Sequence, residues 1–183
     1  MDSEPSSTSR RQAGQARDAV TGVRRFILAS LLILLCGACD QSTKWLAQTH
    51  LPRHAPISFA GDLVRLQYAE NPGAFLSLGA SLPERWRFVI FTGGVALVLA
   101  VLTVYLLFFA SLRPVPLIAL SLVSGGGLSN LYDRIVYGGH VIDFLNVGIG
   151  PLRTGIFNVA DMAIMAGTLL FLFSSRGRPQ QSR

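Results

Sequence analysis

The sequence predicts an all-α integral membrane protein in which four transmembrane helices carry a small β-sheet on the outer, periplasmic side. Composition is the first observation behind this fold class. Half of the 183 residues are hydrophobic and 14% are charged, whereas a soluble domain carries about 25% charged residues. The second observation is that the apolar residues gather in four stretches close to the roughly 20 residues that cross a bilayer, at 26–47, 88–112, 115–131 and 156–173.

One membrane domain is expected over residues 24–175, with a cytoplasmic tail at each end. Residues 1–23 are rich in Ser, Gln, Arg and Gly and contain almost no large apolar side chains. Such a segment cannot bury enough surface to offset the entropy of ordering it, so a disordered tail is predicted. Residues 176–183 have the same character and form the second tail.

The first apolar stretch has two interpretations. Its basic start at Arg24-Arg25, its apolar core and the small residues before Cys39 resemble a lipoprotein signal peptide, which would be removed from a soluble mature protein. Three more membrane-length stretches follow, and the leading tail is long for a signal peptide, so we favour a first span. Cys36 and Cys39 are then small helix-packing residues, since two thiols without nearby histidines make a poor zinc site.

The other three stretches differ in their polar content. Phe88–Leu112 holds 25 residues without a charge, which predicts a plain membrane anchor. The third and fourth stretches are shorter, and each has polar groups near one end. Arg113-Pro114 breaks the chain tightly between the second and third stretches, so these two spans are expected to form an antiparallel pair.

The distribution of charge predicts the orientation. With four spans, both tails and the loop at Arg113 share one side, which carries nine basic and three acidic residues, while the rest of the chain carries seven of each. The positive-inside rule places the first side in the cytoplasm. The net charge of +6 is therefore a topology signal, and no nucleic-acid partner is expected.

The two large loops on the far side contain strand-like segments. Ile57–Ala60 and Leu63–Tyr68 flank Gly61-Asp62, and the second segment alternates apolar and polar residues with the period of a half-buried strand. Gly61-Asp62 is predicted to be a two-residue hairpin turn. Val141–Val147, in the other loop, has similar β-like character, so a small sheet is expected on the outer membrane surface.

Ionisable side chains within the apolar stretches are the candidates for function, because each costs at least about 2.5–3.5 kcal/mol to insert in a bilayer. Asp40 and Lys44 lie at i and i+4 of the first span, so their charges meet on one helix face. One interpretation is a self-neutralising pair in which Lys44 extends outward to the interface. The other is a part in substrate handling.

A second group lies at the end of the third span. Asn130, Asp133 and Arg134 can share one helix face, and Gly125–Gly127 allow neighbouring backbones to approach closely. Arg134 is expected either to pair with Asp133 or to hold another carboxylate. A purely structural network explains this spacing as well as a functional one does.

Asp143 and Asp161 form the third group. Asp161 lies one turn inside the fourth span with Asn158 three residues before it, and Asp143 follows a glycine-rich turn among apolar residues. On one interpretation, Asp161 caps a helix and Asp143 ends a strand. On the other, the two carboxylates come together and share a proton, so that one activates water and the protonated one polarises a scissile carbonyl.

Other chemistries find less support. The three histidines are not spaced as metal ligands, and the sequence contains no H-E-x-x-H, G-x-S-x-G or G-x-x-x-x-G-K motif. Neither a metal nor a cofactor is expected. A small transporter that uses Asp161 as a proton or ion site would need polar residues through the full membrane depth, yet the inner halves of all four stretches are apolar.

Five short blocks of the sequence resemble bacterial lipoprotein signal peptidase, also called signal peptidase II, over about residues 26–173. They occur in that family's order at the mouths of the four spans. The blocks are Asp40-Gln41-x-x-Lys44, Asn71-Pro72-Gly73-Ala74-Phe75, Asn130-x-x-Asp133-Arg134, Val141-Ile142-Asp143-Phe144 and Phe157-Asn158-x-Ala160-Asp161.

The resemblance implies an intramembrane aspartic endopeptidase that removes the signal peptide of prolipoproteins just before a diacylglyceryl-modified cysteine. Asp143 and Asp161 would be the catalytic pair, and water would be the second substrate. The supporting and substrate-binding residues would be Asn71, Asn130, Arg134, Asn158, Asp40 and Lys44. We expect a monomer in the bacterial cytoplasmic (inner) membrane, in contact with membrane lipid, with both termini cytoplasmic and the active site at the outer face.

The sequence departs from the family pattern in two places. Phe75 follows Ala74 directly, where the family commonly has a second alanine, and Ser129 stands where a glycine usually precedes Asn130. These changes affect the expected substrate preference more than the chemistry. A catalytically inactive binder of lipidated proteins would keep the same motifs and stays an alternative.

Overall fold

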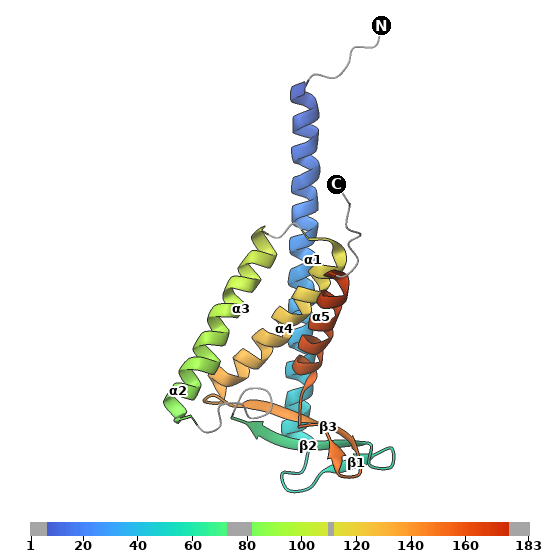
Figure 1. Ribbon diagram of the computed structural model, residues 1–183, viewed down its shortest axis with the longest axis vertical. Coiled ribbons are helices and arrows are strands. Elements are labelled where there is room, and N and C mark those ends of the chain that lie inside the picture. Colours follow the sequence, from blue (N-terminus) through green and yellow to red (C-terminus); the bar gives the residue numbers. More distant parts are fainter. Residues whose placement is uncertain (1–6, 73–81, 110–111, 176–183) are drawn as a thin grey trace, which may run out of the picture.

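The computed structural model describes residues 7–72, 82–109 and 112–175, and the motif residues Gly73–Phe75 lie outside these ranges. The chain forms a bundle of long helices with a sheet at one end (Figure 1). The helical elements are α1 (Ser7–His50), α2 (Glu84–Phe88), the π-helix η2 (Val89–Gly94), α3 (Val95–Val104), the π-helix η3 (Tyr105–Phe109), α4 (Pro114–Val136) and α5 (Val159–Ser175). The strands are β1 (Ile57–Phe59), β2 (Val64–Asn71), β3 (Val141–Ile149) and β4 (Leu152–Arg153).

The predicted membrane fold is confirmed. Three helical segments of the described chain are long and apolar enough to cross a bilayer, namely Gly22–His50, Thr92–Phe109 and Pro114–Val136. The fourth predicted span is the shorter apolar helix Val159–Ser174. At 1.5 Å per residue, α5 is about 26 Å long, slightly less than the roughly 30 Å of a hydrocarbon core.

The ends of the helices differ from the predicted limits. The first helix begins at Ser7, whereas a disordered tail was predicted over residues 1–23. Ala, Gln and Arg in this segment have high helix propensity, and an existing span lets the helix extend upstream without a new nucleation step. The third helix runs to Val136, beyond the predicted end at residue 131, and the fourth starts at Val159 rather than at residue 156.

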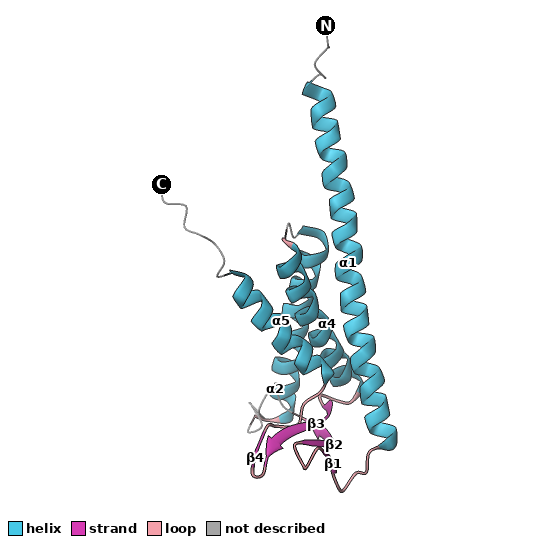
Figure 2. Cartoon of the chain, turned by 90° about the vertical axis from the view of Figure 1, so that its right-hand side faces the viewer, coloured by secondary structure: helices cyan, strands magenta, loops and turns pink. Residues whose placement is uncertain are grey.

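The predicted sheet is also confirmed. Its four strands lie in the order β1-β2-β3-β4, and all neighbours are antiparallel. Figure 2 shows the strands together at one end of the helices. The sheet therefore brings β3, which carries Asp143, to the end of the bundle where α4 finishes and α5 begins.

The predicted two-residue hairpin turn is wrong. Phe59 pairs with Val64, so the loop has four residues, and three of them have positive φ: Ala60, Gly61 and Asp62. The Asp62 carboxylate accepts hydrogen bonds from Ser58 and Arg65, which stabilises the longer loop. These bonds, mainly the one from Arg65, hold the pKa of Asp62 below its usual range.

Helix α4 packs closely against the three other spans through three successive glycines. A Cβ at Gly125 would lie 2.8 Å from Cys36 Cβ in α1, and one at Gly126 would lie 2.5 Å from the Ala160 carbonyl oxygen in α5. A Cβ at Gly127 would lie 2.5 Å from a methyl group of Leu99 in α3. The close backbone approach predicted for these glycines is therefore present on three sides of α4.

Replacing Gly126 by alanine is expected to destabilise the protein. The added methyl would meet backbone, which cannot rotate away, so α4 and α5 must move apart at a cost of about 1–3 kcal/mol. Gly37→Ala in α1 is the matched control, because nothing lies within 4 Å of its added Cβ. Thermal unfolding in detergent should show a lower midpoint for Gly126→Ala only, and equal midpoints for the two variants would contradict the packing described.

Candidate active site

Asp161 is fixed at the start of α5 by a reciprocal pair of hydrogen bonds. The backbone N–H of Asp161 donates to Asn158 Oδ1 at 2.9 Å, and the backbone N–H of Asn158 donates to Asp161 Oδ2 at 3.3 Å. This is the arrangement of a capping box, in which two side chains satisfy N–H groups at a helix start. The helix-capping interpretation of Asp161 is thus correct, and it leaves Oδ1 facing the rest of the site.

Asp143 lies in β3 and is 2% exposed. It accepts a hydrogen bond from Asn71 Nδ2 at 3.0 Å and one from Asn158 Nδ2 at 2.7 Å. Asn71 comes from the end of β2, which pairs with β3, and Asn158 comes from the segment just before α5. The carboxylate is therefore held between a strand and a helix that are far apart in the sequence.

Asn130 of α4 completes the link between the two aspartates. Its Nδ2 donates to Asp161 Oδ1 at 2.9 Å, and its Oδ1 accepts from Asn158 Nδ2 at 3.1 Å. Asn158 thus bonds to Asp143 with its side chain and to Asp161 with both side chain and backbone. The structure brings together five of the residues that the sequence singled out.

Arg134 lies one turn after Asn130 on α4. Its guanidinium donates to the Asn130 carbonyl oxygen at 3.2 Å, and its charge faces Asp161, Asp143 and Asp133. The sequence left open whether Arg134 pairs with Asp133 or holds another carboxylate. Asp133 bonds to Lys44, and the carboxylate charges that act most strongly on Arg134 are those of Asp161 and then Asp143, ahead of Asp133.

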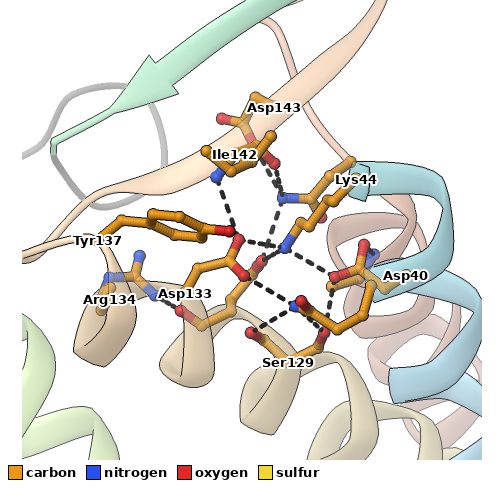
Figure 3. Close-up of polar contacts among 12 residues, drawn as sticks. Asp40, Lys44, Ser129, Asp133, Arg134, Tyr137, Ile142 and Asp143 are labelled. Atoms are coloured by element: carbon orange, nitrogen blue, oxygen red, sulfur yellow. Dashed lines mark hydrogen bonds and ion pairs between the residues drawn. The ribbon is translucent and has the colours of Figure 1, made fainter. Parts of the chain in front are cut away.

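Asp40 and Lys44 form the predicted i, i+4 pair, with 2.7 Å between Lys44 Nζ and Asp40 Oδ2. The prediction that Lys44 extends outward is wrong, because its side chain is 2% exposed and bonds to Asp133 Oδ2 at 2.7 Å and to Asn130 Oδ1 at 2.8 Å. Figure 3 shows Lys44 between Asp40 and Asp133. Two carboxylates and an amide satisfy the ammonium, so water is not needed.

Two further side chains belong to this network, although no role was predicted for them. Gln41 Nε2 donates to Asp133 Oδ1 at 2.8 Å and to Ser129 Oγ at 3.0 Å. Ser129 Oγ donates to Asp40 Oδ2 at 2.7 Å. Ser129 is the position where a glycine was expected, so its hydroxyl adds a bond to Asp40 that a glycine cannot make. The available signal was the presence of polar residues in otherwise apolar stretches.

Burial raises the pKa of Asp143 to about 7, and the charge of Asp161 adds to this effect, while the hydrogen bonds from Asn71 and Asn158 oppose it. Asp143 therefore changes its protonation state near neutral pH, as an acid–base catalyst requires. Within the described residues, no three His, Cys, Asp or Glu side chains gather in a way that could hold a metal ion.

The model of the signal peptidase (SPase) II family matches residues 32–176 of the chain. The chain belongs to this family. A lipoprotein signal peptidase of Moorella thermoacetica is 34% identical over 145 residues, which cover 79% of this chain and 88% of the relative. The lipoprotein signal peptidase of Francisella tularensis subsp. novicida is 33% identical over 154 residues, covering 84% and 91%.

Solved structures show the same fold. A chain described as a bacterial membrane enzyme solved by the in meso method at 2.3 Å resolution superposes with a TM-score of 0.71 at 21% identity, covering 85% of this chain and 94% of that one. A second such structure, at 1.9 Å resolution, gives the same TM-score at 22% identity, covering 83% and 94%. The predicted signal peptidase II resemblance is confirmed, and the chain is a multi-pass membrane peptidase that cleaves the signal peptides of prolipoproteins.

The raised pKa of Asp143 predicts a specific dependence of stability on pH. The folded-state pKa of about 7 lies above the unfolded value of about 3.9. Between these values the folded protein binds a proton that the unfolded chain does not, so the free energy of unfolding falls as pH rises from about 4 to 7. The side chain at this position in the Asp143→Asn variant cannot ionise, so the free energy of unfolding of this variant should exceed that of wild type by an amount that grows across this pH range, to at most roughly 4 kcal/mol.

The measurement of this gain in stability is thermal unfolding in detergent at about pH 4.5, just above the unfolded pKa, and at about pH 8, above the folded pKa. Asp62→Asn is the control of opposite sign. Because the pKa of Asp62 is lowered, its ionised form stabilises the fold above the unfolded pKa of about 3.9, so this variant should lose stability at both pH values. A wild-type-like dependence on pH in Asp143→Asn would contradict the burial argument.

Proposed function

We propose that the chain is an aspartic endopeptidase whose catalytic pair is Asp143 and Asp161. It cuts a prolipoprotein immediately before the diacylglyceryl-modified cysteine. The observation that carries this proposal is that the buried Asp143 carboxylate and the half-buried Asp161 carboxylate are joined through Asn158, which bonds to both. Burial favours one shared proton over two negative charges, and a pair that holds one proton can act as acid and base together.

The chemistry follows from that single proton. The ionised carboxylate takes a proton from water as the water oxygen bonds to the scissile carbonyl carbon, and the protonated carboxyl donates a hydrogen bond to the carbonyl oxygen. The tetrahedral intermediate then breaks its C–N bond, and a carboxyl proton passes to the nitrogen of the lipid-modified cysteine. The products are a free carboxylate on the signal peptide and a free amine on the lipoprotein.

The surrounding residues support this pair. Asn130 and Asn158 orient the carboxylates through the hydrogen bonds given above. The charge of Arg134 faces both aspartates and offsets negative charge that develops during attack. Asn71, at the end of β2, orients Asp143 and is the residue that we assign to the substrate backbone.

Location in the bacterial inner membrane, with the site at the outer face, fits the fold. The described start of α1 and the end of α5 lie toward one end of the bundle, and the sheet lies at the other (Figure 1). Basic residues are concentrated in the tails and at Arg113, which favours a cytoplasmic position for both termini. Every residue of the proposed site comes from one chain, so a monomer suffices, with water as second substrate and no cofactor.

Asp143→Asn and Asp161→Asn should each lower turnover by at least about 10⁴-fold, because removing one member of a catalytic unit disables the whole unit. The measurement is cleavage of a diacylglyceryl-modified prolipoprotein by purified protein in detergent, with binding of the substrate measured separately. Asp62→Asn, an exposed aspartate of the sheet, should keep wild-type turnover. If either dyad variant still cleaves the substrate, the aspartic mechanism is wrong. If the wild-type protein binds the substrate without cleaving it, the protein is a catalytically inactive binder.

The proposed orientation predicts where added reporters become active. Green fluorescent protein fused to the C-terminus should fluoresce, since that terminus is cytoplasmic, whereas alkaline phosphatase fused there should be inactive. Alkaline phosphatase inserted into the loop at Gly61 should be active outside the cytoplasm. The reverse pattern would show that the active site faces inward.

A further inference from the structure

Behind the proposed catalytic pair lies a buried group of three charges, formed by Asp40 and Lys44 of α1 and Asp133 of α4. We call this group the charged triad. The three side chains are at most 2% exposed. Lys44 Nζ lies 2.7 Å from Asp40 Oδ2, 2.7 Å from Asp133 Oδ2 and 2.8 Å from Asn130 Oδ1. An ammonium has three donors, and each of them has one of these acceptors.

One carboxylate of the triad reaches the peptide group next to Asp161. Asp40 Oδ1 accepts a hydrogen bond from the backbone N–H of Ala160 at 2.8 Å, and Ala160 directly precedes Asp161. This bond connects α1 with the first turn of α5. Because the N–H groups at a helix start have no partner within the helix, Asp40 both satisfies one of them and fixes the position of that turn.

The carboxylate of Asp133 bonds in the same way to the backbone of the residue before Asp143. Asp133 Oδ2 accepts a hydrogen bond from the backbone N–H of Ile142 at 3.1 Å, and Ile142 directly precedes Asp143 (Figure 3). This bond connects α4 with β3. Lys44 bonds to the same Oδ2 atom, so the peptide groups before the two proposed catalytic aspartates are joined to each other through a single ammonium.

Lys44 also helps to determine which way the Asn130 amide points, together with Asn158, because both donate to Asn130 Oδ1. Turning this amide by 180° would place its NH₂ group against the ammonium of Lys44 and its oxygen against the carboxylate of Asp161. Both contacts are unfavourable, since an ammonium only donates and a carboxylate only accepts. The amide must therefore direct Nδ2 at Asp161, where it lies 2.9 Å from Oδ1.

We propose that Lys44 is a positioning residue, which sets the separation and hydrogen bonding of the two catalytic aspartates through Asp40, Asp133 and Asn130 without contacting either aspartate. This inference rests on the proposed function of Asp143 and Asp161. It differs from a role in charge balance alone, which would require only that the buried charges sum correctly and would not involve the geometry of the pair.

The test compares two variants that separate these roles. Lys44→Met removes the ammonium that bonds to Asp40, Asp133 and Asn130. It leaves two buried carboxylates without their cation, so this variant is expected to be less stable than wild type. Lys44→Met combined with Asp40→Asn keeps the net charge of the triad, because one positive and one negative charge are removed together. The amide oxygen introduced by Asp40→Asn can still accept from Ala160 N–H, but no ammonium reaches Asp133 and Asn130. Thr43→Val, on the same turn of α1 and bonded only to its own helix, is the matched control.

Turnover, KM and the pH dependence of turnover are measured on a diacylglyceryl-modified prolipoprotein, together with thermal unfolding. The charge-balanced variant should lose about 100-fold in kcat, as expected for a small misplacement of catalytic groups, with KM changed less than about threefold. The limbs of its pH profile should also move, because removing the charge of Lys44 and changing the separation of the pair both alter the two apparent pKa values. The loss of kcat at the optimum of each variant's own pH profile is therefore the deciding readout. A smaller folded fraction cannot move these limbs. The charged groups facing the pair are Lys44 and Asp40 of α1 and Asp133 and Arg134 of α4.

If the charge-balanced variant keeps the wild-type kcat and pH profile, the proposal is overturned, and the role of Lys44 is only to balance the buried charges. Failure of that variant to fold would also overturn it, since Lys44 would then act in folding. Asp143→Asn and Asp161→Asn are assayed in parallel. If they still cleave, the proposed catalytic pair has failed, whereas inactive dyad variants beside a fully active Lys44 variant would show that only the positioning role is wrong.

Discussion

The structure depends on one constraint: polar groups held within a membrane helix bundle need partners from the protein, because lipid offers none. Lys44 shows how this is met, with three acceptors for its three donors. Asp40 and Asp133 in turn accept backbone N–H groups from α5 and β3. The bonds that lower the cost of burying these charges therefore also hold three helices and the sheet together beside the proposed catalytic pair.

The carboxylates of the proposed pair are held differently from those of the charged triad. Neutral amides of Asn71, Asn130 and Asn158 donate to them, whereas an ammonium bonds directly to Asp40 and Asp133. Amide donors orient a carboxylate while leaving burial free to raise the pKa of Asp143 to about 7. The same side-chain type thus takes part in a buried ion pair at Asp40 and Asp133 and accepts amide hydrogen bonds at Asp143 and Asp161.

Much of the fold and of the site could be predicted from the sequence. The four spans follow from long, mainly apolar stretches of the sequence. Four of the five blocks contain side chains that the structure brings together around Asn130 and Lys44, whereas the catalytic roles of Asp143 and Asp161 stay a prediction. The burial of Lys44 could not be predicted, since it depends on Asp133, 89 positions away along the chain. The four-residue hairpin loop follows from bonds of the Asp62 side chain, which a turn propensity does not include. The helix over residues 7–23 reflects its attachment to a span more than its own composition.

Close helix packing is what allows such short side chains to make these connections. An aspartate extends only a few ångströms from its backbone, so Asp40 of α1 can accept from Ala160 of α5 only if both helices lie against α4. The glycines at 125 and 126 provide this approach, since a Cβ on either would collide with α1 or α5. The polar network at the end of α4 therefore depends on the close packing of α4 against α1 and α5. A change that moved α1 or α5 away from α4 would therefore also lengthen the hydrogen bond from Ala160 to Asp40.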